Sequence, residues 1–169
     1  MEYEIVNRVA NSALVTIDLE DFYPEGNRVS LDIAPWLTEG IVLQEKVFRN
    51  YLKTWDTSAY QNCFVALFCS TDAILPGWAY TLVSIQLQGI AKKVVIGTQE
   101  TLETILYSEL IANWDVSSYK DKPVIIKGCA NKPIPENAYV LLAEKLYPVA
   151  KSIMFGEACS SVPLYKKSK

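Results

Sequence analysis

The chain has 169 residues and a net charge of −3, with 50% apolar and 21% charged residues. This composition is typical of a globular protein with a substantial core, and an acidic chain without a basic stripe gives no indication of nucleic-acid binding. The sequence contains no histidine, which excludes catalytic sites that use a histidine base. No apolar run reaches the roughly 20 residues that cross a bilayer, and Met1–Ala10 does not resemble a signal peptide. We therefore expect a cytoplasmic protein, without membrane or nucleic-acid partners, whose cysteines are not in disulfides.

The first 54 residues predict an N-terminal arm followed by a helix. Met1–Ala10 has apolar residues at helical spacing and predicts a short helix. Apolar and polar residues alternate in Ala13–Leu19 and again in Arg28–Ile33, which is typical of half-buried strands. We expect these two strands to pair as a small antiparallel, hairpin-like arm. Glu45–Trp55 is amphipathic and predicts a helix.

The rest of the chain is organised around an internal duplication. Trp55–Gly97 aligns without a gap on Trp114–Gly156, 59 residues further on, with 13 identities in 43 positions. Each copy reads as an apolar run, a loop containing a proline, an amphipathic segment and a second apolar run that ends in glycine. This order predicts one β-α-β unit that is used twice.

The expected strands of the duplicated core are Phe64–Cys69, Val94–Gly97, Val124–Lys127 and Ile153–Phe155, and the expected helices are Pro76–Ala91, Gln99–Asn113 and Pro135–Ala150. Ser161–Lys166 predicts a last edge strand, where Pro163 is tolerated. We therefore predict a single α/β domain over residues 1–169, with the arm and first helix in 1–54 and the duplicated core in 55–169. Its sheet is expected to be mostly parallel, with helices on both faces.

Three of the four cysteines follow predicted strands. Cys69 ends one strand, Cys129 follows another, and Cys159 lies in the loop after a third. Because ligands bind outside the carboxyl ends of parallel strands, we expect these thiols to lie at one edge of the sheet. Three thiolates could hold zinc or an iron–sulfur cluster, and Asp72 or Glu157 could supply a fourth ligand.

Two other interpretations of the cysteines stay open. One of the thiols could be the nucleophile of an enzyme, activated by a lysine or a helix terminus because there is no histidine. The cysteines could also simply pack, since free cysteine behaves as a small apolar residue and no C-x-x-C spacing is present. Cys63, which precedes its strand, is expected to belong to the core.

Other candidate residues give weaker indications. Asp18, Glu20, Asp21 and Glu25 could hold a hard cation, although a solvated loop is the more common role for such a group. Lys127 and Lys132 flank Cys129 and could lower its pKa or bind an anion. Trp78 and Tyr80 could line a pocket or belong to the core. The sequence contains neither of the common glycine-rich motifs for binding phosphate, and thus no nucleotide motif.

Several segments together resemble a known family. They are Ile17–Pro24, Cys69–Pro76, Trp78–Tyr80, Lys127–Cys129 and Met154–Pro163. This combination is similar to the bacterial family catalogued as domain of unknown function 2480, and the resemblance covers nearly the whole chain; Ala158 stands where the family is expected to have proline. The resemblance implies that Cys69, Cys129 and Cys159 belong to family motifs, and it suggests iron–sulfur assembly proteins as partners. The family has no established activity.

From the residues and this resemblance we expect a metal- or cluster-binding accessory protein, with Cys69, Cys129 and Cys159 as ligands. The alternatives are a thiol-dependent enzyme and a non-catalytic interaction module with structural cysteines.

Overall fold

The computed structural model describes residues 14–128, 131–157 and 160–168. The chain forms two compact units: unit 1 contains Met1–Tyr23 and Leu106–Lys169, and unit 2 contains Pro24–Ile105. Unit 2 is therefore inserted into the sequence of unit 1. The prediction of a single domain stays a prediction, because two compact units can be parts of one cooperative domain. The predicted helix at Met1–Ala10 lies outside the described residues.

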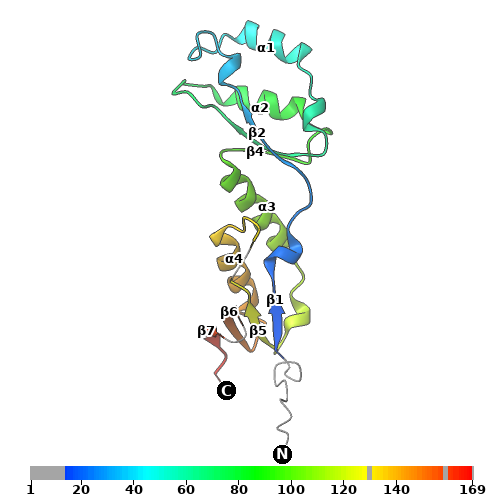
Figure 1. The fold of residues 1–169 in the computed structure, drawn as a ribbon, viewed down its shortest axis with the longest axis vertical. Helices are drawn as coiled ribbons and strands as arrows, with labels where there is room; N and C mark the ends of the chain where they lie inside the picture. Colours follow the sequence, from blue (N-terminus) through cyan, green and yellow to red (C-terminus); the bar gives the residue numbers. More distant parts are fainter. Residues whose placement is uncertain (1–13, 129–130, 158–159, 169) are drawn as a thin grey trace, which may run out of the picture. The chain divides into compact units, whose positions relative to one another are not determined.

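Unit 2 is a three-stranded parallel sheet with helices against it. Its strands occur in the order β2-β3-β4, and its helices α1 and α2 lie on one side of the sheet (Figure 1). The bounds are β2 Arg28–Asp32, 3-10 helix Ala34–Trp36, α1 Glu45–Thr54, β3 Phe64–Phe68, α2 Gly77–Gln86, β4 Lys93–Ile96 and the first residues of α3 Gln99–Asn113.

Unit 1 contains a four-stranded sheet in the order β1-β5-β6-β7. The first three strands are parallel, and β7 pairs antiparallel with β6. The bounds are β1 Val15–Ile17, 3-10 helix Leu19–Phe22, the last residues of α3, β5 Pro123–Ile126, α4 Glu136–Leu146, β6 Ser152–Glu157 and β7 Ser160–Lys166. The α/β class with mostly parallel strands and a small antiparallel part is confirmed, and that antiparallel part is β6 with β7.

The predicted pairing of the first two strands is wrong. β1 pairs parallel with β5, and β2 pairs parallel with β3, so these strands do not form a hairpin. The strands also belong to two sheets instead of the single sheet that we predicted. Alternation identified the strands correctly, but it does not specify which neighbour a strand pairs with.

The structural duplication is longer than the sequence repeat. Val15 pairs with Val124 and Val29 pairs with Val65, and Val65 and Val124 are themselves equivalent in the repeat. β1 is therefore the counterpart of β2, with an offset of 14 residues. The sequence signal is Val15-Thr-Ile-Asp-Leu beside Val29-Ser-Leu-Asp-Ile. Each unit thus has the same sequence of elements: strand, aspartate, 3-10 helix, helix, strand, helix, strand.

Each unit has its own core between the sheet and its helices. In unit 1 the buried cluster joins β1, α3, β5, α4 and β6, and in unit 2 it joins β2, α1, β3 and α2. β3 is buried along most of its length, which explains its continuous apolar sequence. Cys63 is 5% exposed and belongs to the core of unit 2, as predicted.

Most element ends agree with the sequence within a few residues. The helix predicted at Gln99–Asn113 has those bounds, and Pro163 lies in the terminal strand β7. α2 ends at Gln86 and α4 at Leu146, earlier than predicted, since Gly89 and Pro148 follow them. Within the part of the chain that the structure describes, no helix is both long and apolar enough to cross a membrane.

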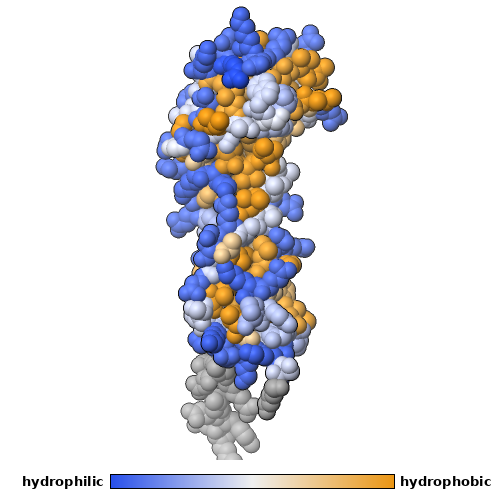
Figure 2. All heavy atoms as spheres, turned by 180° about the vertical axis from the view of Figure 1, so that it is seen from behind, coloured by the Kyte–Doolittle hydropathy of each residue, from blue (hydrophilic) through white to orange (hydrophobic). Residues whose placement is uncertain are grey.

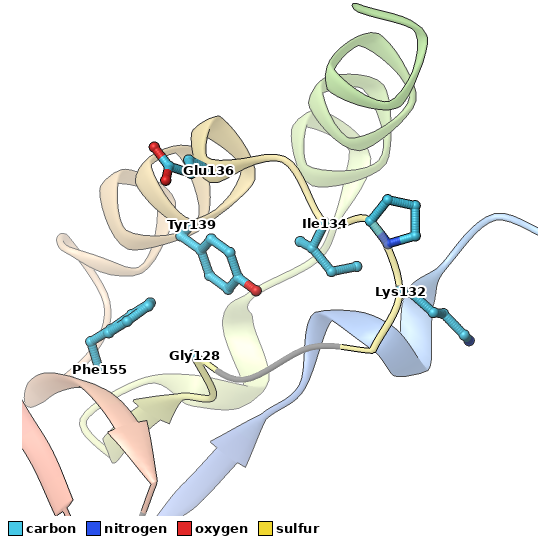
Figure 3. Close-up of a pocket in the computed structure, with 7 residues that line it drawn as sticks. Gly128, Lys132, Ile134, Glu136, Tyr139 and Phe155 are labelled. Carbon is cyan, nitrogen blue, oxygen red and sulfur yellow. The ribbon is translucent and has the colours of Figure 1, made fainter. Parts of the chain in front are cut away.

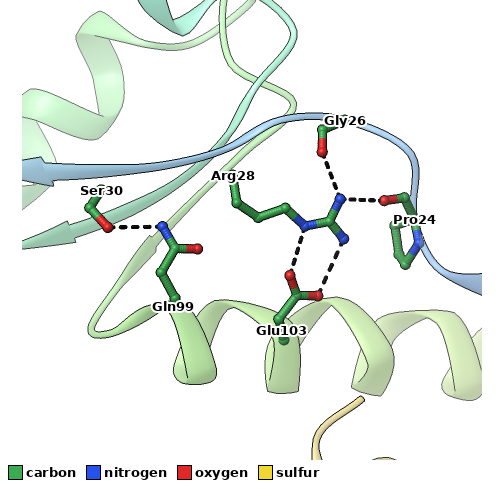
Figure 4. Close-up of polar contacts among 6 residues, drawn as sticks. All are labelled: Pro24, Gly26, Arg28, Ser30, Gln99 and Glu103. Atoms are coloured by element: carbon green, nitrogen blue, oxygen red, sulfur yellow. Dashed lines mark hydrogen bonds and ion pairs between the residues drawn. The ribbon is translucent and has the colours of Figure 1, made fainter. Parts of the chain in front are cut away.

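A buried ion pair attaches the start of α3 to the sheet of unit 2 (Figure 4). Arg28 Nε donates to Glu103 Oε1 at 2.7 Å, and the two side chains are 14% and 5% exposed. The guanidinium also donates to the carbonyl oxygens of Pro24 and Gly26, at 2.6 and 2.7 Å. One arginine therefore neutralises a buried carboxylate and fixes the turn before β2.

Replacing Arg28 by methionine should lower the free energy of unfolding by about 3–5 kcal/mol, because the carboxylate of Glu103 is left buried without its counterion. Chemical denaturation measures the change. The matched control is Arg49→Met, which removes an exposed pair with Glu45 and should cost less than about 1 kcal/mol. Equal losses in the two variants would contradict the assignment of Arg28 as a structural anchor.

Candidate functional site

In unit 1 a carboxylate at the end of β1 connects two neighbouring strands. Asp18 Oδ1 accepts the backbone N–H of Glu20 at 3.0 Å, and Asp18 Oδ2 accepts Lys127 Nζ at 2.5 Å. Lys127 follows β5, and its backbone N–H donates to the carbonyl of Ile17 at 2.9 Å. Asp18 therefore closes the 3-10 helix after β1 and at the same time fixes the residue that follows β5.

The pKa values of this pair move in opposite directions. Partial burial alone would raise the pKa of Asp18, but hydrogen bonds from Lys127 and Glu20, together with the charges of Lys127 and Lys132, lower it. The hydrogen bond to Asp18 raises the pKa of Lys127, and the charges of Glu157 and Glu20 add to this effect. The pair is thus ionised at neutral pH.

Glu20 holds the loop after β5 from the other side. Its carboxylate accepts the backbone N–H groups of Asn131 and of Lys132, the latter at 2.9 Å. These two amides lower the pKa of Glu20. Lys132 Nζ in turn donates to the carbonyl oxygen of Glu20 at 3.0 Å and lies 5.2 Å from the ring centroid of Tyr23. The acidic residues after β1 therefore serve as acceptors for lysines and amides of the facing loop.

A cavity of about 490 Å³ opens between this loop and the start of α4 (Figure 3). Its lining residues are Gly128, Lys132, Pro133, Ile134, Glu136, Tyr139 and Phe155. The rings of Tyr139 and Phe155 meet edge to face at 5.4 Å between centroids. A Cβ atom on Gly128 would lie 2.7 Å from the ring of Phe155, so the ring occupies the space that a side chain would need.

Unit 2 has a related arrangement after its first strand. Asp32 is the counterpart of Asp18, and its carboxylate accepts the N–H of Ala34 at 2.9 Å and both the N–H and the hydroxyl of Ser70, at 3.0 and 2.6 Å. Partial burial would raise the pKa of Asp32, but these hydrogen bonds lower it. In both units, therefore, the aspartate after the first strand of the unit holds the loop after the neighbouring strand, which is β5 in unit 1 and β3 in unit 2.

Cys69 follows β3 in unit 2 and is half-buried. Its sulfur lies 3.4 Å from Thr71 Oγ1, and because the Thr71 hydroxyl donates to the carbonyl of Gly40, the thiol is the donor to Thr71. Burial raises the pKa of the Tyr80 phenol, and its proximity to Cys69 and Asp32 raises it further. Cys69 is equivalent in the repeat to Gly128, so the two units carry different groups at this position.

The predicted ligands are distributed as follows. Cys69 and Asp72 belong to unit 2, where Asp72 is exposed, and Glu157 is half-buried at the end of β6 in unit 1. Cys129 and Cys159 lie outside the described residues. Among the residues that are described, no group of three or more Cys, Asp or Glu side chains is arranged to hold a metal. Convergence of the three cysteines stays a prediction.

Sequence reasoning missed the roles of Asp18, Glu20 and Asp32. Asp18 and Glu20 were considered as cation ligands, whereas both accept hydrogen bonds from lysines and backbone amides. The repeated Val-x-(Ile/Leu)-Asp pattern was the signal that could have identified Asp18 and Asp32 as equivalent. The cavity beside Tyr139 had no such signal, because it depends on how the loop after β5 is held.

Replacing Lys127 by methionine should raise the pKa of Asp18 toward its usual value of 3.8. Because the pKa of Asp18 is lowered by folding, its contribution to stability is present above the unfolded pKa and is lost as the pH falls through the folded value. Following the side-chain carboxyl resonance of Asp18 by NMR during an acid titration measures both values. A wild-type pKa at or above 3.8 would contradict the ion pair.

Comparison with known proteins identifies the family of the chain. A family model described as "Protein of unknown function (DUF2480)" matches residues 3–167, so the chain belongs to this family and the resemblance found in the sequence is confirmed. No curated protein and no solved structure matches the chain significantly.

Proposed function

We propose that this member of the family is a cytosolic accessory protein that binds a metal ion or an iron–sulfur cluster through Cys129 and Cys159 in unit 1. The observation that carries the proposal is the parallel pairing of β5 with β6, in which Ile126 lies opposite Phe155. Cys129 follows Ile126 by three residues, and Cys159 follows Phe155 by four. Neighbouring strands are about 4.8 Å apart and each residue extends the chain by about 3.3 Å, so both thiols are within reach of one point beyond this edge.

Two lysines flank Cys129 in the sequence. Lys127 lies two residues before Cys129 and is held protonated by Asp18. Lys132 lies three residues after Cys129 and is fixed by Glu20. A positive charge close to a thiol favours the thiolate, which is the form that binds metal.

The carboxylate of Glu157 is the proposed oxygen ligand. It is half-buried at the end of β6, two residues after Phe155, which lies opposite Ile126 at the end of β5. A site with two thiolates and one carboxylate would leave the fourth position of a tetrahedral ion to an exogenous group, which is suited to transfer of the metal or cluster. For a cluster, the partners would be iron–sulfur assembly proteins. The contribution of Cys69 and Asp72 to the same centre stays a prediction, and the proposed site is built from unit 1 alone.

A second candidate function is a thiol-dependent enzyme with Cys129 as the nucleophile. The observation that favours it is the cavity of about 490 Å³, because Gly128, the residue before Cys129, forms part of its wall. A substrate in this cavity would lie beside the apolar and aromatic side chains of Ile134, Tyr139 and Phe155. Lys127 would then lower the pKa of the nucleophile in place of a histidine.

Metal analysis of protein purified without oxygen tests the metal site. The wild type should contain stoichiometric zinc or iron, and Cys129→Ser or Cys159→Ser should reduce the metal content by about tenfold or more, because loss of a ligand weakens a site at least as much as loss of a supporting residue. Cys69→Ser is the matched control and should retain the metal. An equal loss in Cys69→Ser would instead support a three-cysteine centre.

Thiol reactivity separates the remaining functions. If the wild type contains no metal and binds no added zinc, the metal proposal is wrong. One thiol that reacts far faster than the others with an alkylating reagent, and that is lost in Cys129→Ser, would then support the enzyme. Uniformly slow thiols would support the interaction module with structural cysteines.

A further inference from the structure

The two units differ in what covers their last parallel strand. In unit 1, β7 pairs antiparallel with β6 along its length, from Ser152 opposite Lys166 to Glu157 opposite Ser160. The counterpart of β6 in unit 2 is β4, which pairs only with β3 among the described residues. β4 is thus an open edge at the position where the other copy of the same fold accepts an antiparallel strand.

The contacts of β7 show what such a strand touches. Tyr165 stacks on Tyr147, which follows α4, with 4.5 Å between ring centroids. Leu164 and Tyr165 also line a cavity of about 340 Å³ together with Ile153 of β6 and Glu144 of α4. The added strand therefore packs beside the last turn of the helix that precedes β6.

The equivalent surface of unit 2 is apolar and exposed. Ile85 of α2 is the counterpart of Glu144, and Ile96 of β4 is the counterpart of Phe155. Their side chains are 60% and 58% exposed. Apolar side chains reach the surface between polar ones on the face drawn in Figure 2. Unit 2, whose edge is open, therefore has Ile85 at this position. Unit 1, whose edge is covered by β7, has Glu144.

The backbone of β4 is suited to pairing. The N–H of Gly97 donates to the carbonyl of Leu67, toward β3, so alternation along the strand directs the N–H and C=O of Val94 and of Ile96 toward the open edge. β4 contains no proline. By contrast, β7 carries Pro163, a residue that protects edge strands from further pairing.

We propose that β4 pairs antiparallel with β4 of a second copy of this chain, which joins the two three-stranded sheets into one of six strands. A two-fold axis makes the two β4 strands antiparallel, which is the direction of β7 on β6. A register centred on Val95 places Val95 opposite its symmetry mate and Val94 opposite Ile96, and it keeps Lys93 away from its symmetry mate. Ile85 from each copy adds apolar contact beside the new strand pair.

Sedimentation equilibrium of the full chain tests the proposal. The apparent mass of the wild type should rise with protein concentration, over about 1–200 μM, from the chain mass of 19.0 kDa toward twice that value. This range is expected for a small interface. Val94→Pro removes an outward N–H without removing a bond to β3, and it should keep the protein at 19.0 kDa throughout this range. Ile85→Glu, which restores the residue type of unit 1, should weaken the dimer by about tenfold or more.

Val140→Glu is the matched control, because Val140 is 53% exposed on α4 of unit 1, whereas the proposed interface is formed by residues of unit 2. It should dimerise like the wild type. A wild type that stays monomeric, a folded Val94→Pro variant that still dimerises, or an equal loss in Val140→Glu would each overturn the proposal. Circular dichroism establishes which variants are folded. If Val94→Pro is not folded, retention of the dimer in Ile85→Glu overturns the proposal and its loss supports it.

Discussion

The arrangement of both units depends on one interaction, the hydrogen bonding of the aspartate that ends the first strand. Asp18 and Asp32 each accept a backbone N–H two residues ahead, and each also accepts a donor from the loop that follows the neighbouring strand. A parallel pair of strands has no hairpin to fix the end of one against the end of the other. The carboxylate supplies that connection, and it does so at the edge where ligands of parallel sheets bind.

The two copies have diverged around this shared framework. In unit 1 the donor is a lysine, Glu20 adds a second acceptor, and Gly128 leaves room for Phe155. In unit 2 the donor is Ser70, and Cys69 stands where unit 1 has the glycine. The same backbone thus carries a charged loop beside a cavity in one unit and a thiol beside a tyrosine in the other. Duplication lets one copy maintain the fold while the other acquires a different site.

The sequence predicted the positions of helices and strands better than it predicted which strands pair. The duplication and the helix Gln99–Asn113 follow directly from identity and periodicity, because these are properties of the local sequence. The hairpin of β1 with β2 was wrong because alternation specifies a buried face and leaves the neighbouring strand unspecified. The prediction of a single sheet was wrong for a related reason. Because unit 2 is inserted into the sequence of unit 1, the strands of the two units follow one another along the chain and resemble the strands of one sheet.

For the candidate site, the sequence drew attention to Lys127 and Lys132 but not to what holds them, and the role of the cysteines stays a prediction. Spacing cannot show that Glu20 accepts amides 111 and 112 residues away, and this contact forms only when β1 and β5 pair. Cys69 illustrates the same limit, since it follows a strand of one sheet whereas β5 and β6, which precede Cys129 and Cys159, belong to the other. Which strand ends share an edge is a property of topology, and it decides which thiols could share a metal.

The central claim is that the acidic turn after β1 holds the loop that carries Cys129. Amide hydrogen exchange at Asn131 and Lys132 tests it most directly, because both N–H groups donate to Glu20. The account predicts slow exchange in the wild type and in Asp21→Ala, and much faster exchange at these two amides in Glu20→Ala. Identical exchange in the wild type and Glu20→Ala would contradict it.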